Sequence, residues 1–137
     1  YRQAGEFEEC VLDTLAACSF LKGIGAEKII LVGHSFGGAV VIKAAALTDT
    51  VVAVGSLSSQ RFGTSEIDKL NKPLLLIHGS NDDILDKAAS EDIFSRANQP
   101  KDIVIIEGAG HGLSENAEDV FVLLNTFIQK HAADGVN

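Results

Sequence analysis

Hydrophobic residues are arranged in two ways along this chain: in short unbroken runs, and in longer stretches where they recur every three or four positions. The unbroken runs predict four buried strands, at residues 28–32, 51–56, 73–79 and 101–107. The helical spacing predicts helices at residues 7–21, 35–47, 84–97 and from 114 onward, with one helical turn at 65–70. Strands that are apolar throughout and separated by helices indicate an α/β fold class: a mostly parallel sheet of about four strands flanked by helices.

The last predicted helix has a candidate core face. Its apolar positions follow helical spacing, so we expect them to pack on the sheet together. They are Val120, Phe121, Leu124, Phe127 and Ile128. His131, near the end of this helix, is expected to be solvated.

The first strand runs directly into the sequence Gly33-His34-Ser35-Phe36-Gly37, and a helix of small residues follows. This order of strand, sharp turn and helix places Ser35 at the tip of the turn. Glycines two positions before and after the serine are expected to remove Cβ atoms that would block so tight a turn. The Phe36 N–H opens the helix, where the positive end of the helix dipole favours a developing oxyanion. Ser35 is therefore a candidate nucleophile, although the same pattern also occurs in ordinary glycine-rich turns.

With its strand and helix, this turn resembles the nucleophile elbow of the α/β-hydrolase family. In that family the chain order is serine, acid, histidine, with each residue in a loop at the end of a strand. His111 lies in the Gly-rich loop after the fourth strand, which is similar to the family's histidine loop. The resemblance implies that His111 is the base. We expect His34 to point away from the attacking side of Ser35, and His78 to be a hydrogen-bonded structural residue.

The acid is expected after the third strand, where the chain reads His78-Gly79-Ser80-Asn81-Asp82-Asp83. The family's H-G-x-x-D pattern places the acid at Asp82. Asp83 is the rival, because a shift of one residue would exchange the two. Either aspartate could instead cap the helix that follows.

The resemblance implies a serine hydrolase that cleaves carboxylic esters or thioesters through an acyl-enzyme, without metal or organic cofactor. Two other functions stay open: different acyl chemistry on the same triad, as in a peptidase or acyltransferase, and a catalytically silent binding or assembly protein. Only 16 residues separate Ser56 from Pro73, too few for a cap domain. The chain therefore looks most like lidless esterases of the dienelactone hydrolase type, which implies an open site for small or medium acyl groups. Gln60 and Leu113 are candidate substrate-binding residues at this site.

Composition narrows the remaining classes. A length of 137 residues and a hydrophobic content of 46% predict a single domain over residues 1–137. The net charge of −8 argues against nucleic acid and anionic membrane surfaces as partners, and no apolar run reaches the ~20 residues of a membrane span. Cys10 and Cys18 fall on the apolar face of one helix, roughly 12 Å apart, too far for a disulfide. Buried free thiols favour a reducing, cytoplasmic location.

The chain begins later than the hydrolase fold would. It contains no methionine, and the family's first strands are absent, which indicates a piece of a longer polypeptide. The loop that supplies a second oxyanion donor would be absent with them. The strand at residues 29–32 would then be a sheet edge, and we expect a missing N-terminal segment of the same protein to pair with it.

Overall fold

The computed structural model describes residues 4–133 of the chain. The helices and strands alternate, as the sequence pattern predicts. In chain order they are α1 (Ala4–Gly23), β1 (Ile29–His34), α2 (Phe36–Ala46), β2 (Val51–Leu57), β3 (Leu74–Gly79), α3 (Ala88–Arg96), β4 (Lys101–Ile106) and α4 (Ala117–Ala133), with short 3₁₀ turns at Ile67–Lys69 and Ser114–Asn116.

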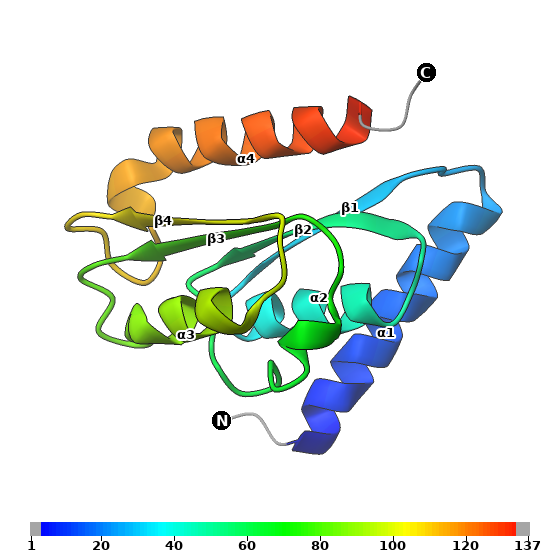
Figure 1. Cartoon of the computed structure of the whole chain (residues 1–137), viewed down its shortest axis with the longest axis horizontal. Helices are drawn as coiled ribbons and strands as arrows, with labels where there is room; N and C mark the ends of the chain where they lie inside the picture. Colours follow the sequence, from blue (N-terminus) through cyan, green and yellow to red (C-terminus); the bar gives the residue numbers. More distant parts are fainter. Residues whose placement is uncertain (1–3, 134–137) are drawn as a thin grey trace.

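The four strands form one sheet in the order β1-β2-β3-β4, and every neighbouring pair is parallel. Helices α1, α2 and α3 lie on one face of this sheet, and α4 covers the other (Figure 1). The α/β fold class predicted from the sequence is thus confirmed. Because all strands run in the same direction, the loops that follow β1, β3 and β4 all lie at the carboxyl ends of the strands.

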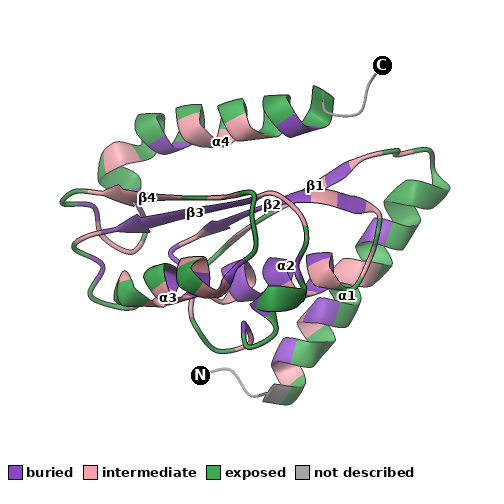
Figure 2. Ribbon diagram, in the orientation of Figure 1, coloured by how far each residue is buried: buried purple, intermediate pink, exposed green. Residues whose placement is uncertain are grey.

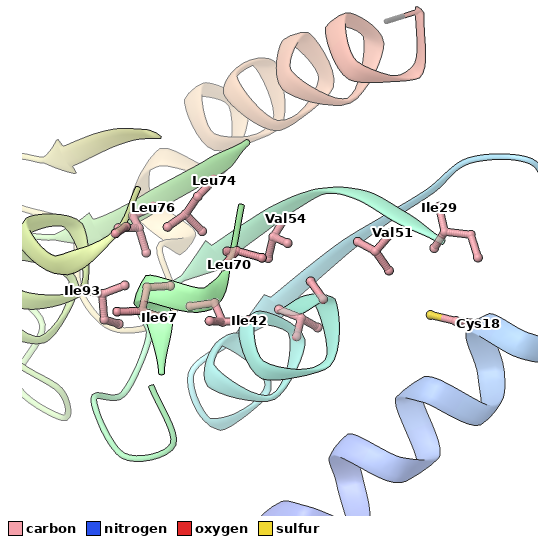
Figure 3. Packing of buried hydrophobic residues seen from close by; sticks show 13 residues of the cluster. Cys18, Ile29, Ile42, Val51, Val54, Ile67, Leu70, Leu74, Leu76 and Ile93 are labelled. Atoms are coloured by element: carbon pink, nitrogen blue, oxygen red, sulfur yellow. The ribbon is translucent and has the colours of Figure 1, made fainter. Parts of the chain in front are cut away.

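Strand β3 lies at the centre of the core. All six of its residues are buried, and their side chains alternate between the two faces of the sheet. Leu74 and Leu76 pack with Ile42 of α2 on the three-helix face (Figure 3), while Leu75 and Ile77 pack beneath α4. Full burial of each such side chain contributes roughly 1.5–3 kcal/mol, so β3 fixes the positions of the layers on both sides.

Strand β1 is much less enclosed. It is one of the two edge strands of the sheet, and no strand within residues 4–133 pairs with its outer side. Ile29 is buried, but exposure rises along the strand, and Val32 is 39% exposed. Figure 2 shows the contrast between this edge and the buried centre of the sheet.

Helix α4 contacts the sheet through a narrower stripe than we expected. Phe121 is 67% exposed and Ile128 is 37% exposed, so the prediction that both belong to the core face is wrong. The prediction that His131 is solvated is also wrong: it is buried and packs its ring 4.7 Å from that of Phe127. Val120, Phe127 and His131 lie along one line on the surface of α4. Phe121 and Ile128, each one residue after a member of this line, lie to the side of it.

Two smaller predictions are also corrected. Helix α3 begins at Ala88, four residues later than expected. Both cysteines are free thiols, but only Cys18 is buried, and Cys10 is half-buried. Burial raises the pKa of the Cys18 thiol, while a hydrogen bond from Thr50 and the Lys72 charge oppose that rise.

None of the helices within residues 4–133 combines the length and the apolar character needed to cross a membrane.

Candidate active site

The turn between β1 and α2 consists of a single residue, Ser35. Its φ of 61° and ψ of −119° are sparsely populated for a residue with a side chain, at a cost of about 1–3 kcal/mol. Three backbone hydrogen bonds hold it there: Ser35 N–H donates to Leu57 O at 2.8 Å, and Ser35 O accepts from Gly38 N–H at 3.0 Å and from Gln60 N–H at 3.5 Å. The chain thus keeps the serine in a strained, fixed position at the tip of the turn.

The glycines around Ser35 do not all contribute equally. A Cβ at Gly33 would lie 2.2 Å from the carbonyl oxygen of Gly37, and one at Gly38 would lie 2.5 Å from Ser56 Oγ. A Cβ at Gly37 would meet nothing within 4 Å. The expectation that both flanking glycines of the motif make room for the turn is therefore correct for Gly33 and wrong for Gly37.

Asp82 lies in the loop after β3, with its side chain fully buried. Its Oδ1 accepts the N–H of Ile84 at 2.9 Å and that of Leu85 at 2.7 Å. The carboxylate therefore organises this loop, which explains why the regular turns of α3 begin only at Ala88. Asp83 is exposed, and the acceptor in each of these hydrogen bonds is Asp82.

His111 comes from the loop after β4 and reaches both predicted partners. Its Nδ1 donates to Asp82 Oδ2 at 2.8 Å, and its Nε2 lies 3.0 Å from Ser35 Oγ. With Nδ1 donating to a carboxylate, Nε2 is left to accept the hydroxyl proton. The loop can approach because residue 79 is a glycine: a Cβ there would lie 2.1 Å from Ala109 O.

Electrostatics favour the charged form of the acid. Burial works to raise the pKa of Asp82, but the N–H groups of Leu85 and Ile84 and the His111 ring outweigh it, so the pKa lies below its usual value. A carboxylate that stays ionised can stabilise positive charge on a neighbouring imidazole.

Two histidines that we did not place in the site contact it. His34 does not point away: its Nε2 donates to His111 O at 2.8 Å, and the two rings lie 4.8 Å apart. Ser58 Oγ donates to the same carbonyl at 2.8 Å, so two donors fix the histidine loop. His78 is buried and hydrogen-bonded, as predicted, and its Nε2 also lies 3.1 Å from Asp82 Oδ2. The sequence signal for these contacts is that both histidines lie at or near the ends of predicted strands: His34 is the last residue of β1, and His78 is the penultimate residue of β3.

The predicted oxyanion and substrate residues lie around this centre. Phe36 is the first residue of α2, and its ring packs edge-on against Phe7 with 5.7 Å between centroids. Gln60 is half-buried, and its side-chain amide donates to Phe62 O at 3.1 Å within its own loop. Leu113 is 4% exposed, adopts a left-handed φ of 61°, and lines a groove of about 450 Å³ that also borders His34.

Two further features are separate from this centre. A pocket of about 650 Å³ lies between α1 and the loop after β2, with Phe7, Arg61 and Arg96 among its lining residues. Its lining includes none of Ser35, Asp82 and His111, nor any residue adjacent to them in the chain. The groove beside Leu113, by contrast, is lined by His34 and Gly112, the neighbours of Ser35 and His111. Across residues 4–133, no group of three or more His, Cys, Asp or Glu side chains is placed to hold a metal ion.

Comparisons with known proteins identify the family and the fold of this chain. Residues 2–134 match the model of the dienelactone hydrolase family. A segment of 46 residues is 37% identical to human alpha/beta hydrolase domain-containing protein 17B, covering 34% of this chain and 16% of that protein.

Solved structures resemble the chain over most of its length. A dienelactone hydrolase from Anabaena variabilis superposes with a TM-score of 0.81 at 26% identity, covering 88% of this chain and 59% of its own. Est1E from Butyrivibrio proteoclasticus gives a TM-score of 0.82 at 20% identity, covering 90% of this chain and 70% of its own. The chain thus spans 59% and 70% of the lengths of these two structures.

Proposed function

This chain belongs to the dienelactone hydrolase family, and we propose that it carries the nucleophile, base and acid of a serine hydrolase acting on carboxylic esters or thioesters. The observation that carries the proposal is the continuous hydrogen-bonded series from Ser35 Oγ through the His111 ring to Asp82 Oδ2. A nucleophile, a base within reach of it and a group that orients the base are the requirements for acyl transfer through a serine.

The proposed mechanism uses each member of the series in turn. His111 Nε2 takes the Ser35 proton as Oγ attacks the acyl carbonyl, and the imidazolium then protonates the leaving alcohol or thiol. Asp82 holds the Nδ1–H tautomer and stabilises the imidazolium without itself taking the proton. Water, activated by His111, then hydrolyses the acyl-enzyme and restores Ser35.

The oxyanion would form beside the start of α2. The proposed donor is the Phe36 N–H, at the positive end of the helix dipole. One donor of this kind is worth about 3–4 kcal/mol in comparable enzymes. The second donor expected in this fold would come from a segment that precedes this chain.

We propose that the substrate is an ester with a small or medium acyl group, bound in the groove beside His34 and Leu113. The groove is open to solvent and lined largely by apolar side chains, which suits an alkyl or aryl group. Gln60, in the loop after β2, is proposed to contact the substrate. The backbone N–H of Gln60 donates to Ser35 O at 3.5 Å, so this residue lies close to the proposed nucleophile.

We also propose that the outer edge of β1 pairs with a segment of the same protein outside this chain. A free edge strand with apolar residues is a template for further pairing.

The free thiols of Cys10 and Cys18 favour the cytoplasm as the location.

A fluorophosphonate probe tests the serine chemistry directly. We expect the protein to label at Ser35 and to hydrolyse p-nitrophenyl esters, with the highest kcat/KM for acyl chains of two to eight carbons. Ser35→Ala should not label, and its kcat for ester hydrolysis should fall by about 10⁶-fold. Ser95→Ala, at an exposed serine of α3, is the matched control and should change neither. Labelling that survives in Ser35→Ala would place the nucleophile elsewhere.

A further inference from the structure

His78 is completely buried behind the proposed acid and has no part in the proposed mechanism. Its Nδ1 lies 2.6 Å from Ser90 Oγ of α3, and its Nε2 lies 2.7 Å from Leu85 O. The same Nε2 lies 3.1 Å from Asp82 Oδ2, which is the oxygen that binds His111. Two imidazoles therefore approach a single carboxylate oxygen.

We infer that His78 is a positioning residue for the acid: its Nε2–H holds Leu85 in place and directs its positive end at Asp82 Oδ2, which weakens the hold of that oxygen on a protonated His111. This inference rests on the proposed serine hydrolase function. It assigns to His78 a role beyond packing, in setting the pH range over which His111 can act as a base.

The surroundings of His78 fix which nitrogen carries its proton. A backbone carbonyl and a carboxylate can only accept hydrogen bonds, so the nitrogen that faces both must carry a hydrogen. Ser90 Oγ is the partner of Nδ1 and can donate its hydroxyl hydrogen to it. The Nε2–H tautomer of His78 therefore satisfies all of these groups at once.

The consequence for Asp82 follows from charge. Leu85 is part of the arrangement, because its N–H donates to Asp82 Oδ1 while its carbonyl accepts from His78. Without the N–H of His78, Oδ2 would have one fewer positive neighbour and would attract the His111 imidazolium more strongly. The titratable side chains that face this cluster are His78 from β3, His111 from the loop after β4, and His34, whose ring packs at a tilt against that of His111.

Two substitutions that differ by one methylene separate this role from packing. An amide nitrogen in His78→Gln can reach the position of Nε2, whereas one in His78→Asn reaches only the position of Nδ1, beside Ser90. We expect the acid limb of the kcat/KM profile of His78→Asn, measured with p-nitrophenyl acetate, to move to higher pH by about 0.5–1 unit. The plateau should fall by less than about threefold, and His78→Gln should return the limb toward its original position.

His131→Asn is the matched control, because His131 is also buried but packs against Phe127 in α4. Its acid limb should not move. An unchanged limb in His78→Asn, or a shift to lower pH, would overturn the inference. If the unaltered protein neither labels with fluorophosphonate nor hydrolyses esters, it is the proposed function that fails instead.

A measurement on the unaltered protein covers the case in which His78→Asn does not fold. In ¹⁵N-histidine NMR spectra, we expect neutral His78 to carry its proton on Nε2. A His78 that is protonated on Nδ1 alone would overturn the inference, because Nε2 could then donate neither to Leu85 O nor toward Asp82.

Discussion

Strands β3 and β1 each deliver one end of the hydrogen-bonded series, but in very different surroundings. Every residue of β3 is buried, and the side chain of Asp82, which follows it, is buried and hydrogen-bonded to His111 of the histidine loop. β1 is an edge strand whose exposed side carries Val32, and it ends at the strained Ser35. The proposed acid therefore lies in an enclosed part of the fold, whereas the proposed nucleophile stands beside an open edge.

This difference separates two requirements of a serine hydrolase. Orientation of the base depends on burial and fixed hydrogen bonds, which β3 and its loop provide. Stabilisation of the oxyanion depends on donors around the nucleophile, and the proposed donor in this chain is the Phe36 N–H.

The largest effect is expected at the acid itself. Asp82→Asn should lower kcat by about 10⁴-fold, because an amide in place of the carboxylate neither fixes the His111 tautomer nor balances its charge. Asp83→Asn is the matched control one residue away and should change kcat by less than twofold. A larger loss in Asp83→Asn than in Asp82→Asn would reverse the assignment of the acid.

A smaller effect is expected at the tight approach of β1 to α2. Gly33→Ala would place a Cβ against the Gly37 carbonyl and should lower the free energy of unfolding by about 2–4 kcal/mol. Gly37→Ala has open space for its Cβ and lies within α2, so it should leave stability unchanged or raise it slightly. Thermal unfolding followed by circular dichroism compares the two, and equal losses would contradict this account of the turn.

Hydrogen exchange compares the two strands without mutation. Amides of β3 should exchange only on global unfolding, because both of its edges are paired. In this chain alone, alternate amides of β1 should exchange at least about tenfold faster than those of β3, since an edge strand donates only every second N–H to its neighbour. In a longer protein that supplies the expected partner strand, uniform protection of β1 should result, and unchanged fast exchange would count against that pairing.

The smallest effect is on acid stability. Because the pKa of Asp82 is lowered on folding, its ionisation favours the folded state above about pH 4 and this contribution is lost as pH falls through the folded-state value. Unfolding by urea between pH 5 and pH 2.5 should thus show a steeper loss of stability for the unaltered protein than for Asp82→Asn. Parallel curves for the two proteins would contradict the pKa direction.

The strands, the helices and the parallel sheet followed from periodicity, because apolar runs and helical spacing are local properties of the sequence. The approach of Ser35, Asp82 and His111 could be expected only through the resemblance to the hydrolase family. The contacts of His34 and His78 could not be predicted, since they depend on where two loops cross.

Errors in the predicted helices had local causes. The start of α3 was predicted too early because the side chain of Asp82 takes up the N–H groups of Ile84 and Leu85. On α4, hydrophobicity alone placed Phe121 inside and His131 outside, whereas the geometry of the packed stripe placed them the other way round.

The two oxygens of Asp82 have different tasks: one holds the loop before α3, and the other orients His111. Residues that serve catalysis usually cost stability, so replacing them often yields a firmer protein. Strained Ser35 fits that rule, but Asp82 does not, because its loss would weaken the loop and the chemistry together. During evolutionary drift toward a silent hydrolase fold, this chain would therefore be expected to lose its serine sooner than its aspartate.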